Sequence, residues 1–306
     1  MQTSKYYPET ANKDRNVSKL IKAFEGLQEG LKPYSNPPNG MFGRVAIIES
    51  NGIRINSEEI DLEYDVPFDD DLEANEAEII IYNLSDTTIQ ALKYNKVISI
   101  TAGYRNDTGV IFDGVITKIT TKREGRDKRT VIKALDDRNL QEKEIEEITY
   151  KENTTASYIL KDLIRRIPLP LVVFNPRRDH VYKDEQKVSG GLMENIKKYS
   201  EVCGISVYIN KRKIYARHIS EGDNINFVAC ADTGLLDSPE EFEEEVTAED
   251  YKEVITGYKF SMILQHRLTT AAIITLNSLN VSGQFRVRSG RHTFNGSETI
   301  TEVEVI

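Results

Sequence analysis

Few residues of this 306-residue sequence have the types and spacing that catalysis or metal binding requires. The four histidines lie far apart, and none belongs to an HExxH or Cys–His motif: His180, His218, His266 and His292. The two cysteines, Cys203 and Cys230, cannot form a disulfide framework, and no partner base can be placed for either thiol as a nucleophile. The sequence therefore predicts no metal centre and no cysteine-based chemistry.

Acidic side chains are numerous, and their number alone permits a pair of catalytic carboxylates of the glycosidase kind. Such a pair needs burial or neighbouring charges that separate the two pKa values, whereas runs such as Asp69–Asp71 and Glu243–Glu245 are usually solvated. The Asp69–Asp71 run also lacks the spacing and central glycine of a calcium-binding EF-hand loop. No phosphate-binding or nucleophile-elbow motif is present. We therefore expect no enzyme activity, no cofactor and no catalytic, cofactor-binding or metal-binding residue, and the partner-binding residues are unassigned.

One basic cluster surrounds Gly125, interleaved with Glu124 and Asp127 and without an aromatic residue: Lys118, Lys122, Arg123, Arg126, Lys128 and Arg129. The simplest interpretation is a solvated hairpin tip. A contact with an acidic protein surface is the functional alternative, and a nucleic-acid contact comes third. The net charge of −9 argues against a general nucleic-acid binder, because such binding depends on clustered Lys and Arg.

The residues that precede and follow this cluster predict a β-rich segment over 44–140. The Asn51-Gly52 pair predicts a two-residue hairpin. Ser85 is expected to cap a short helix. Strands are expected at Arg44–Glu49, Ala77–Leu84, Val110–Thr121 and Thr130–Leu135. Short strands at regular spacing with one small helix predict a closed or nearly closed barrel.

Residues 153–220 change to a mixed α+β pattern. A helix capped by Thr154 or Thr155 has apolar residues at helical spacing, and a second helix ends at Gly204. An alternating hairpin follows, and turns at Asn210-Lys211. The acidic run at 238–253 predicts a solvated helix or linker, and β alternation returns from Val254 to Ile306.

Residues 1–40 form a polar, slightly basic segment that ends in a Pro-rich stretch, and we expect an arm that orders only when it docks. This segment has no apolar core of a signal peptide, and no stretch of about 18 apolar residues predicts a transmembrane helix. The length is typical of two or three domains. Two scattered cysteines fit a protein folded in a reducing cytoplasm.

Two hairpins far apart in the sequence share a pattern of an alternating strand, a small-residue break, a polar turn, and then glycine and a strand with one aromatic residue. The first comprises Val97–Gly103 and Gly109–Val115, and the second Ile273–Ser278 and Gly283–Val287. Many hairpins share this pattern, so coincidence is one interpretation. The other is a duplicated barrel with the α+β segment inserted between its two copies.

The segment Glu76–Ile119 resembles the first barrel of bacteriophage tail hub proteins. The motifs that carry this resemblance are Tyr82-Asn83-Leu84-Ser85, Ala102-Gly103-Tyr104 and Phe112-Asp113-Gly114-Val115-Ile116. Four later segments are similar to the closing barrel of that family: Leu264–Leu268, Ile273–Leu276, Ser282–Val287 and Gly290–His292. The resemblance spans roughly residues 40–306 in order, and points to the hub of PBSX-type defective prophages and contractile R-type bacteriocins.

The resemblance implies an α+β, mainly β chain with two tube-like β-barrel domains and an inserted small α+β module. The expected divisions are a polar N-terminal arm and Pro-rich linker at 1–40, a first tube-like β-barrel domain at 41–150, an inserted α+β module at 151–237 and a second tube-like β-barrel domain at 238–306.

It also implies a structural baseplate hub protein of a contractile tail, from a phage or a phage-tail-like bacteriocin. Such a hub is a homotrimeric ring that adapts the sixfold tail tube to the threefold spike, because two similar modules in each of three chains present six similar contacts. The implied partners are the tail tube, spike, baseplate wedge and tape-measure proteins, with no specific nucleic acid binding and no membrane insertion. The implied location is the tail baseplate of a virion or bacteriocin particle, assembled in the host cytoplasm.

Two alternatives remain open: a wall-degrading tail-associated protein, and a cell-wall-binding protein centred on residues 153–220. A separate hypothesis concerns the run Asn56–Leu92, which contains twelve acidic residues and no Lys or Arg. In a ring, this run could line an acidic lumen that repels passing DNA.

Overall fold

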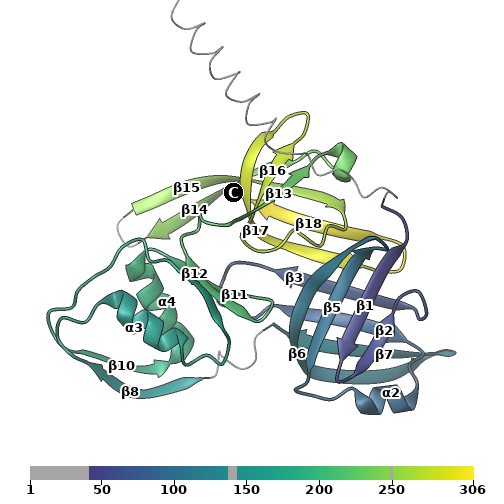
Figure 1. Cartoon of the computed structure of the whole chain (residues 1–306), viewed down its shortest axis with the longest axis horizontal. Helices are drawn as coiled ribbons and strands as arrows, with labels where there is room; N and C mark the ends of the chain where they lie inside the picture. The colour runs from purple at the N-terminus through teal and green to yellow at the C-terminus, as the bar shows by residue number, and fades with distance from the viewer. Residues whose placement is uncertain (1–40, 137–142, 249–250) are drawn as a thin grey trace, which may run out of the picture. The chain divides into compact units, whose positions relative to one another are not determined.

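The computed structural model describes residues 41–136, 143–248 and 251–306, which belong to one compact unit, residues 36–306. Strands dominate these ranges, and a segment with two helices separates two strand-rich parts along the sequence (Figure 1). The predicted mainly β class with an inserted α+β module is therefore confirmed. The predicted arm at 1–40 lies outside the described residues. In the described ranges, no helix has the length and apolar character needed to cross a membrane.

The first module is a five-stranded antiparallel sheet in the order β3-β4-β7-β6-β5. Its buried face is rich in isoleucine, because alternate residues of each strand point into one core. Its strands are β3 (Leu62–Phe68), β4 (Glu76–Tyr82), β5 (Val97–Tyr104), β6 (Asp107–Glu124) and β7 (Asp127–Leu135).

A hairpin and a short helix complete this part. β1 (Arg44–Ser50) and β2 (Ile53–Asn56) extend the sheet beyond β5. The predicted Asn51-Gly52 turn is confirmed, because both residues have the positive φ that such a turn needs. Helix α2 (Asp86–Ala91) begins after Ser85, whose hydroxyl accepts a hydrogen bond from the Thr88 amide at 3.0 Å, as predicted for a cap.

The inserted module packs two helices against two small sheets around its own apolar core. Thr155 caps α3, and Gly204 ends α4 with φ 64°, as the sequence predicts. Its elements are β8 (Glu144–Tyr150), α3 (Ala156–Ile164), β9 (Leu171–Phe174), β10 (Gln186–Gly191), α4 (Leu192–Cys203), β11 (Ser206–Asn210) and β12 (Lys213–Arg217).

The second module is again a five-stranded antiparallel sheet, in the order β14-β15-β18-β17-β16. The prediction of a solvated helix or linker at 238–253 is wrong, because most of this run forms β14 and begins β15. Glu240, Glu241 and Glu243 are exposed and tolerated in a strand, because β14 lies at the end of the hydrogen-bonded sheet, where water can reach them. Its strands are β14 (Glu240–Ala248), β15 (Tyr251–Ile263), β16 (Ala272–Asn277), β17 (Ser282–Phe294) and β18 (Thr299–Val305).

The two modules repeat the same strand order and the same connections. Each consists of a strand pair, a connection, and then three strands of which the middle one is long. The long strands even share an irregularity. β6 shifts register against β7 between Ile116 and Lys118, and β17 shifts against β18 between Val287 and Ser289. This agreement supports the duplication interpretation of the two similar hairpins.

One continuous hydrogen-bonded path joins the two modules, and among the described strands it runs open from β14 to β2. The link is the long strand β17, which pairs with β16 at its start and with β3 further along. The two sheets thus share one ladder. The prediction of a closed or nearly closed barrel over 44–140 is wrong for the described strands, because their paired path stays open at both ends. β13 (Asp223–Ala229), from the region predicted as 151–237, pairs in parallel with β16, and a 3-10 turn at Ala231–Thr233 follows it. The domain boundaries themselves stay a prediction.

Candidate assembly site

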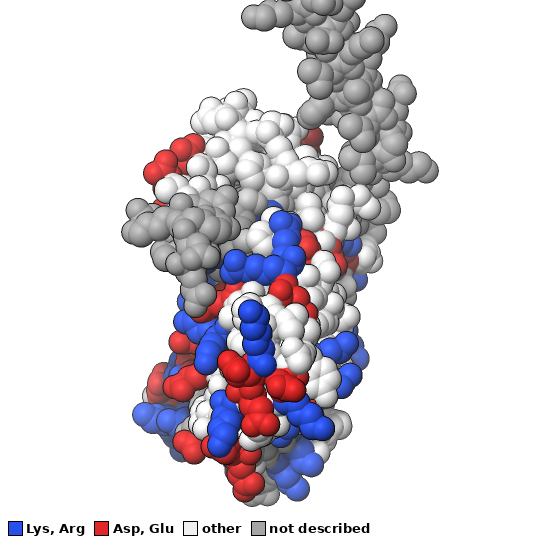
Figure 2. Space-filling model, turned by 90° about the vertical axis from the view of Figure 1, so that its left-hand side faces the viewer, with Lys and Arg blue, Asp and Glu red and all other residues white. Residues whose placement is uncertain are grey.

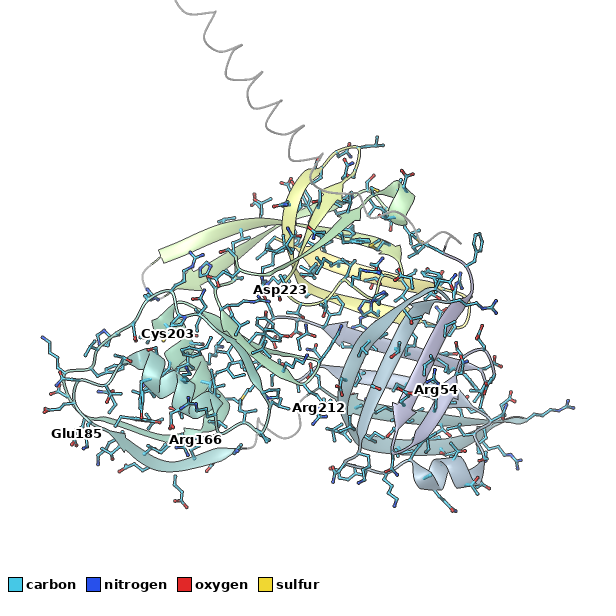
Figure 3. The ribbon with its side chains drawn as sticks, viewed as in Figure 1. Arg54, Arg166, Glu185, Cys203, Arg212 and Asp223 are labelled. Carbon is cyan, nitrogen blue, oxygen red and sulfur yellow. The ribbon has the colours of Figure 1, made fainter. Side chains whose placement is uncertain are left out.

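Among the described residues, no three His, Cys, Asp or Glu side chains gather as metal ligands would. Cys203 lies in the core of the inserted module (Figure 3), where burial raises the pKa of its thiol to about 11. This thiol is a packing residue, because its reactive thiolate form is suppressed at neutral pH. Cys230 accepts a contact from the Thr233 hydroxyl at a turn.

The four histidines do not form one cluster, although the charge of His266 acts on His292. The ring of His180 packs against Tyr182 with centroids 4.7 Å apart, and Nδ1 of His218 lies 2.8 Å from the Ser220 hydroxyl. His292 is buried on β17, where burial, and then the charge of Lys211, lowers its pKa to about 3. A neutral buried imidazole is a structural group, not a ready general base. The fourth, His266, belongs to a contact between the modules.

The strongest contact between the modules is a buried ion pair beside the β3–β17 ladder. The Arg286 guanidinium donates to Asp70 at 2.6 Å, and the two side chains are only 3% and 8% exposed. Arg288 lies 3.5 Å from the other oxygen of Asp70, and Nε of Arg286 donates to the Glu221 carbonyl at 2.8 Å. The expectation that the Asp69–Asp71 run is solvated is therefore wrong for Asp70, which the fold desolvates against arginines of a distant segment.

The neighbouring carboxylates order the loop after β3. Burial, followed by the nearby charge of Asp71, raises the pKa of Asp69 to about 6. Asn75 donates its side-chain amide to Asp136 at 3.1 Å, and its backbone amide to the same carboxylate at 2.9 Å. The Thr270 hydroxyl donates to the Asp69 carbonyl at 3.0 Å. The Asn75 contacts fix the loop within the first module, and the Thr270 hydrogen bond holds it against the second module.

A second polar contact ties the start of β6 to the segment after β15. Arg267 donates two hydrogen bonds to Asp107, at 2.6 and 2.8 Å, and His266 Nε2 lies 3.0 Å from the same carboxylate. Burial lowers the pKa of His266, although the Asp107 hydrogen bond opposes this shift. Gly109 makes the approach possible, because a Cβ there would lie 2.2 Å from the imidazole. The sequence flagged both segments as similar to a family, but nothing in it showed that they touch.

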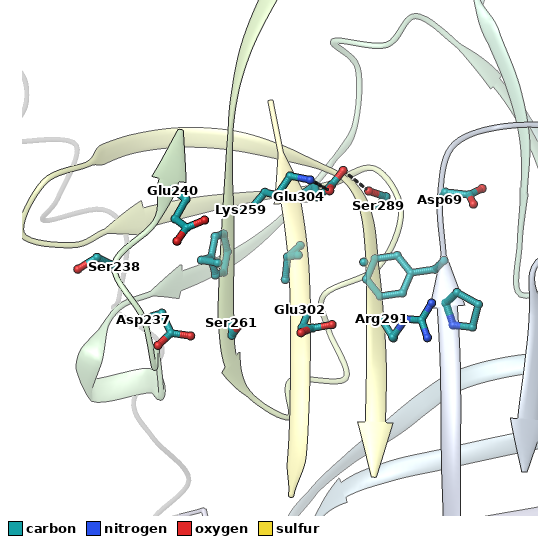
Figure 4. Close-up of a pocket in the computed structure, with 15 residues that line it drawn as sticks. Asp69, Asp237, Ser238, Glu240, Lys259, Ser261, Ser289, Arg291, Glu302 and Glu304 are labelled. Atoms are coloured by element: carbon teal, nitrogen blue, oxygen red, sulfur yellow. Dashed lines mark hydrogen bonds and ion pairs between the residues drawn. The ribbon is translucent and has the colours of Figure 1, made fainter. Parts of the chain in front are cut away.

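An open groove of about 720 Å³ crosses the second module beside this junction (Figure 4). Carboxylates outnumber cations along it. Glu304 is paired with Lys259 at 2.5 Å and accepts from Ser289 at 2.9 Å. Four further carboxylates in the groove have no ion pair within the described ranges: Asp69, Asp237, Glu240 and Glu302. The groove is therefore an acidic surface with unsatisfied charge.

The β6–β7 hairpin carries the opposite charge. Four of the cluster's cations are exposed and lack an ion pair in the described part of the chain: Lys118, Lys122, Arg123 and Arg126. Lys128 instead pairs with Asp86 at 2.7 Å. This unpaired positive charge favours contact with an acidic surface, which the sequence left as an alternative to a solvated tip.

The acidic run at 56–92 is partly neutralised by basic residues from elsewhere. Glu58 pairs with Arg105 at 2.8 Å, and Asp65 with Arg291 at 2.6 Å. Lys133 lies 2.5 Å from Glu76. The hypothesis of an acidic lumen stays a prediction, weakened for those carboxylates that are already paired.

In the inserted module, charged residues pair with each other: Lys187 lies 3.4 Å from Glu147, and Arg166 lies 3.0 Å from Asp162. On the face that Figure 2 shows, acidic and basic side chains are intermixed. The Arg217 side chain is nearly buried, and it donates to both oxygens of Asp223 at 3.1 and 2.8 Å. This fork ties β12 to the start of β13, close to the second module.

Comparisons with known proteins agree with this architecture. No family model matches the sequence, and no curated protein matches it significantly. A tail protein from Neisseria meningitidis has a similar structure, with a TM-score of 0.60 at 10% identity, over 86% of this chain and 96% of that one. The 43 kDa tail protein of prophage MuSo2 from Shewanella oneidensis gives 0.59 at 6% identity, over 86% and 97%.

A component of the E. coli type VI secretion system, described as similar to phage T4 tail proteins, gives a TM-score of 0.58 at 10% identity, over 85% of this chain and 76% of that one. At these identities the likeness concerns the fold alone. The fold of this chain is that of phage tail proteins, and the sequence-based resemblance to tail hub proteins is confirmed at that level.

Proposed function

We propose that this chain is a structural baseplate hub protein of a contractile tail, in which three copies form a ring between a sixfold tube and a threefold spike. The observation that carries the proposal is the duplicated five-strand sheet, joined within one chain by the β3–β17 ladder. Two equivalent modules in each of three chains offer six similar surfaces, which is what a sixfold partner needs. The fold shared with tail proteins supports the same role.

The proposed partners are a second and third copy of this chain, the tube and the spike, with the wedge and tape-measure proteins at the periphery. The proposed location is the tail baseplate of a phage or bacteriocin particle, assembled in the host cytoplasm. We propose no catalytic step. The buried ion pairs and histidines near the junction hold strands together, and their partners are other side chains of the chain.

Light scattering over a concentration series tests the ring. We expect a species of three times 34.8 kDa, and images of it should show a central pore. A compact dimer, or a monomer at every concentration, would contradict a self-assembling ring. Zymography on cell walls and a pull-down with peptidoglycan test the wall-degrading and wall-binding alternatives, and the proposal expects neither cleavage nor retention.

A further inference from the structure

Several strand edges are open in the described chain, including the outer edge of β2, and two of them lie on β6 and β14, one in each module. β6 pairs with β7 to its end but with β5 only as far as Val115, so the later part of β6 has an unpaired edge. β14 pairs with β15 on one side, and no described strand lies along its other edge. Open edges present rows of backbone donors and acceptors that another strand can satisfy.

Rows of directly opposite residues show which strands correspond. Each row starts at the residue that follows the register shift of the long strand and crosses four strands. The row of the first module, from β6 to β3, is Lys118, Lys133, Glu78 and Asp65. The row of the second module, from β17 to β14, is Ser289, Glu304, Lys259 and Glu240 (Figure 4). Glu240 on the open edge of β14 is therefore the counterpart of Asp65 on β3.

The junction inside the chain shows what such an edge binds. Asp65 of β3 lies opposite Thr293 of β17 in an antiparallel ladder. Thr293 follows Ser289 by the same number of residues as Lys122 follows Lys118, so Lys122 is the counterpart of Thr293. β3 thus occupies, along β17, the place that is open along β6. The counterpart of β3 is β14, which does not reach β6 of its own chain.

We propose that residues 119–122 of β6 in one copy pair antiparallel with residues 240–243 of β14 in a second copy, with Lys122 opposite Glu240. This contact repeats the β3–β17 junction between chains, and it rests on the proposed ring. The two edges are different surfaces of one chain. Each copy therefore binds one neighbour through its β6 edge and the other neighbour through its β14 edge. A head-to-tail contact of this kind generates a closed ring when its rotation closes.

The side chains on the two edges fit this pairing. Lys122 on β6 is exposed and has no ion pair among the described residues, and the same holds for Glu240 on β14, which lies opposite Lys122 in this register. Opposite charges placed directly across an antiparallel pair are favourable, and like charges are unfavourable. A β6 edge therefore favours a β14 edge over another β6 edge, which selects a head-to-tail contact.

Cysteine cross-linking of the full chain tests the pairing, with Cys230 changed to Ser and the buried Cys203 retained. Residues directly opposite in an antiparallel pair have Cα atoms within the range that a disulfide spans. On mixing K122C with E240C under oxidising conditions, we expect a two-chain product that neither variant forms alone. The double variant K122C/E240C should yield a covalent three-chain product. The control T121C/E240C should not cross-link, because Thr121 points to the opposite face of the strand.

Charge reversal gives an independent readout. Lys122→Glu or Glu240→Lys alone should weaken association by about two- to fivefold per contact, and the two together should restore it. A trimeric mass without the K122C–E240C product would overturn this contact and leave the ring intact. The charges on the two edges would then serve only to keep the open strands from aggregating. A monomeric mass without the product would overturn both. Equal cross-linking of the T121C/E240C control would overturn the register.

Discussion

The long strands β6 and β17 occupy corresponding places in the two modules. The half of the strand after the register shift has a neighbouring strand on both sides in β17, but an open edge in β6. On β17 this half is paired with β3 and carries Gly290, which has no side chain, and His292, which is buried. On β6 the corresponding positions are Ile119 and Thr121, followed by the exposed Lys122. The paired edge thus includes a small and a desolvated residue, whereas the open edge keeps charge that water or a partner can satisfy.

The largest effect is expected at the buried ion pair of the covered side. Asp70→Ala should lower the free energy of unfolding by about 3–5 kcal/mol, because it leaves the Arg286 guanidinium buried without its carboxylate. Chemical denaturation measures this loss. The control Glu73→Ala, at an exposed position of the same loop, should change stability by less than about 0.5 kcal/mol. Equal effects of the two changes would mean that Asp70 is solvated.

A side chain at Gly290 should disrupt the ladder itself. A Cβ there would lie 2.4 Å from the Glu302 carbonyl oxygen and 2.5 Å from the Phe68 ring. Gly290→Val should therefore cost about 1–3 kcal/mol, the range for overpacked sites. The counterpart change Ile119→Val, on the open edge, should cost about 0.5–1.5 kcal/mol. Thermal unfolding of both variants measures the two losses of stability. Equal losses would contradict the difference between the covered and the open edge.

The covered edge should also be acid-sensitive through His292. Its pKa of about 3 in the folded chain lies below the ordinary value of 6.5, so the unfolded chain binds more protons between these values. Stability should then fall as the pH drops from about 6.5 toward 3, by up to about 1.4 kcal/mol per pH unit from this group. Denaturation at several pH values should show a shallower slope for His292→Leu. An unchanged slope would contradict the buried neutral imidazole.

The smallest effect is expected at the surface of the junction. Arg291 and Asp65 form an ion pair of 2.6 Å, but their side chains are 48% and 41% exposed. Arg291→Ala should cost only about 0.2–1 kcal/mol, and less at high salt, because exposed pairs are screened. Denaturation at two salt concentrations checks this. A cost like that of Asp70→Ala would show that the pair is more desolvated than its exposure indicates.

Local features were predictable from the sequence because neighbouring residues decide them. Ser85 and Thr155 cap helices, Asn51-Gly52 makes a hairpin turn, and Gly204 ends a helix, each through its own backbone preference or side-chain hydrogen bond. The acidic run at 238–253 was misjudged, because its strand state depends on pairing with β15. A high glutamate content indicates that a segment is exposed to water, but it does not show whether its backbone pairs with another strand.

The candidate assembly site could not be predicted from the sequence, for the same reason. The basic cluster around Gly125 was visible, but its counterpart edge at β14 was not, since the correspondence is read across rows of paired strands. Asp70 looked like a member of a solvated run until the fold placed Arg286 beside it. Contacts between residues so far apart in the chain leave no periodic signal in either segment.

By itself, the sequence determined several turns and helix ends, the mainly β class, the inserted helical module and the pattern of a repeated hairpin, because alternation, capping and turn chemistry act over a few residues. Only the tertiary structure decided that the two modules share one ladder, which edge is covered and which is open, and which charges are buried. Those outcomes depend on register and desolvation between distant strands, and these exist only once the chain has folded.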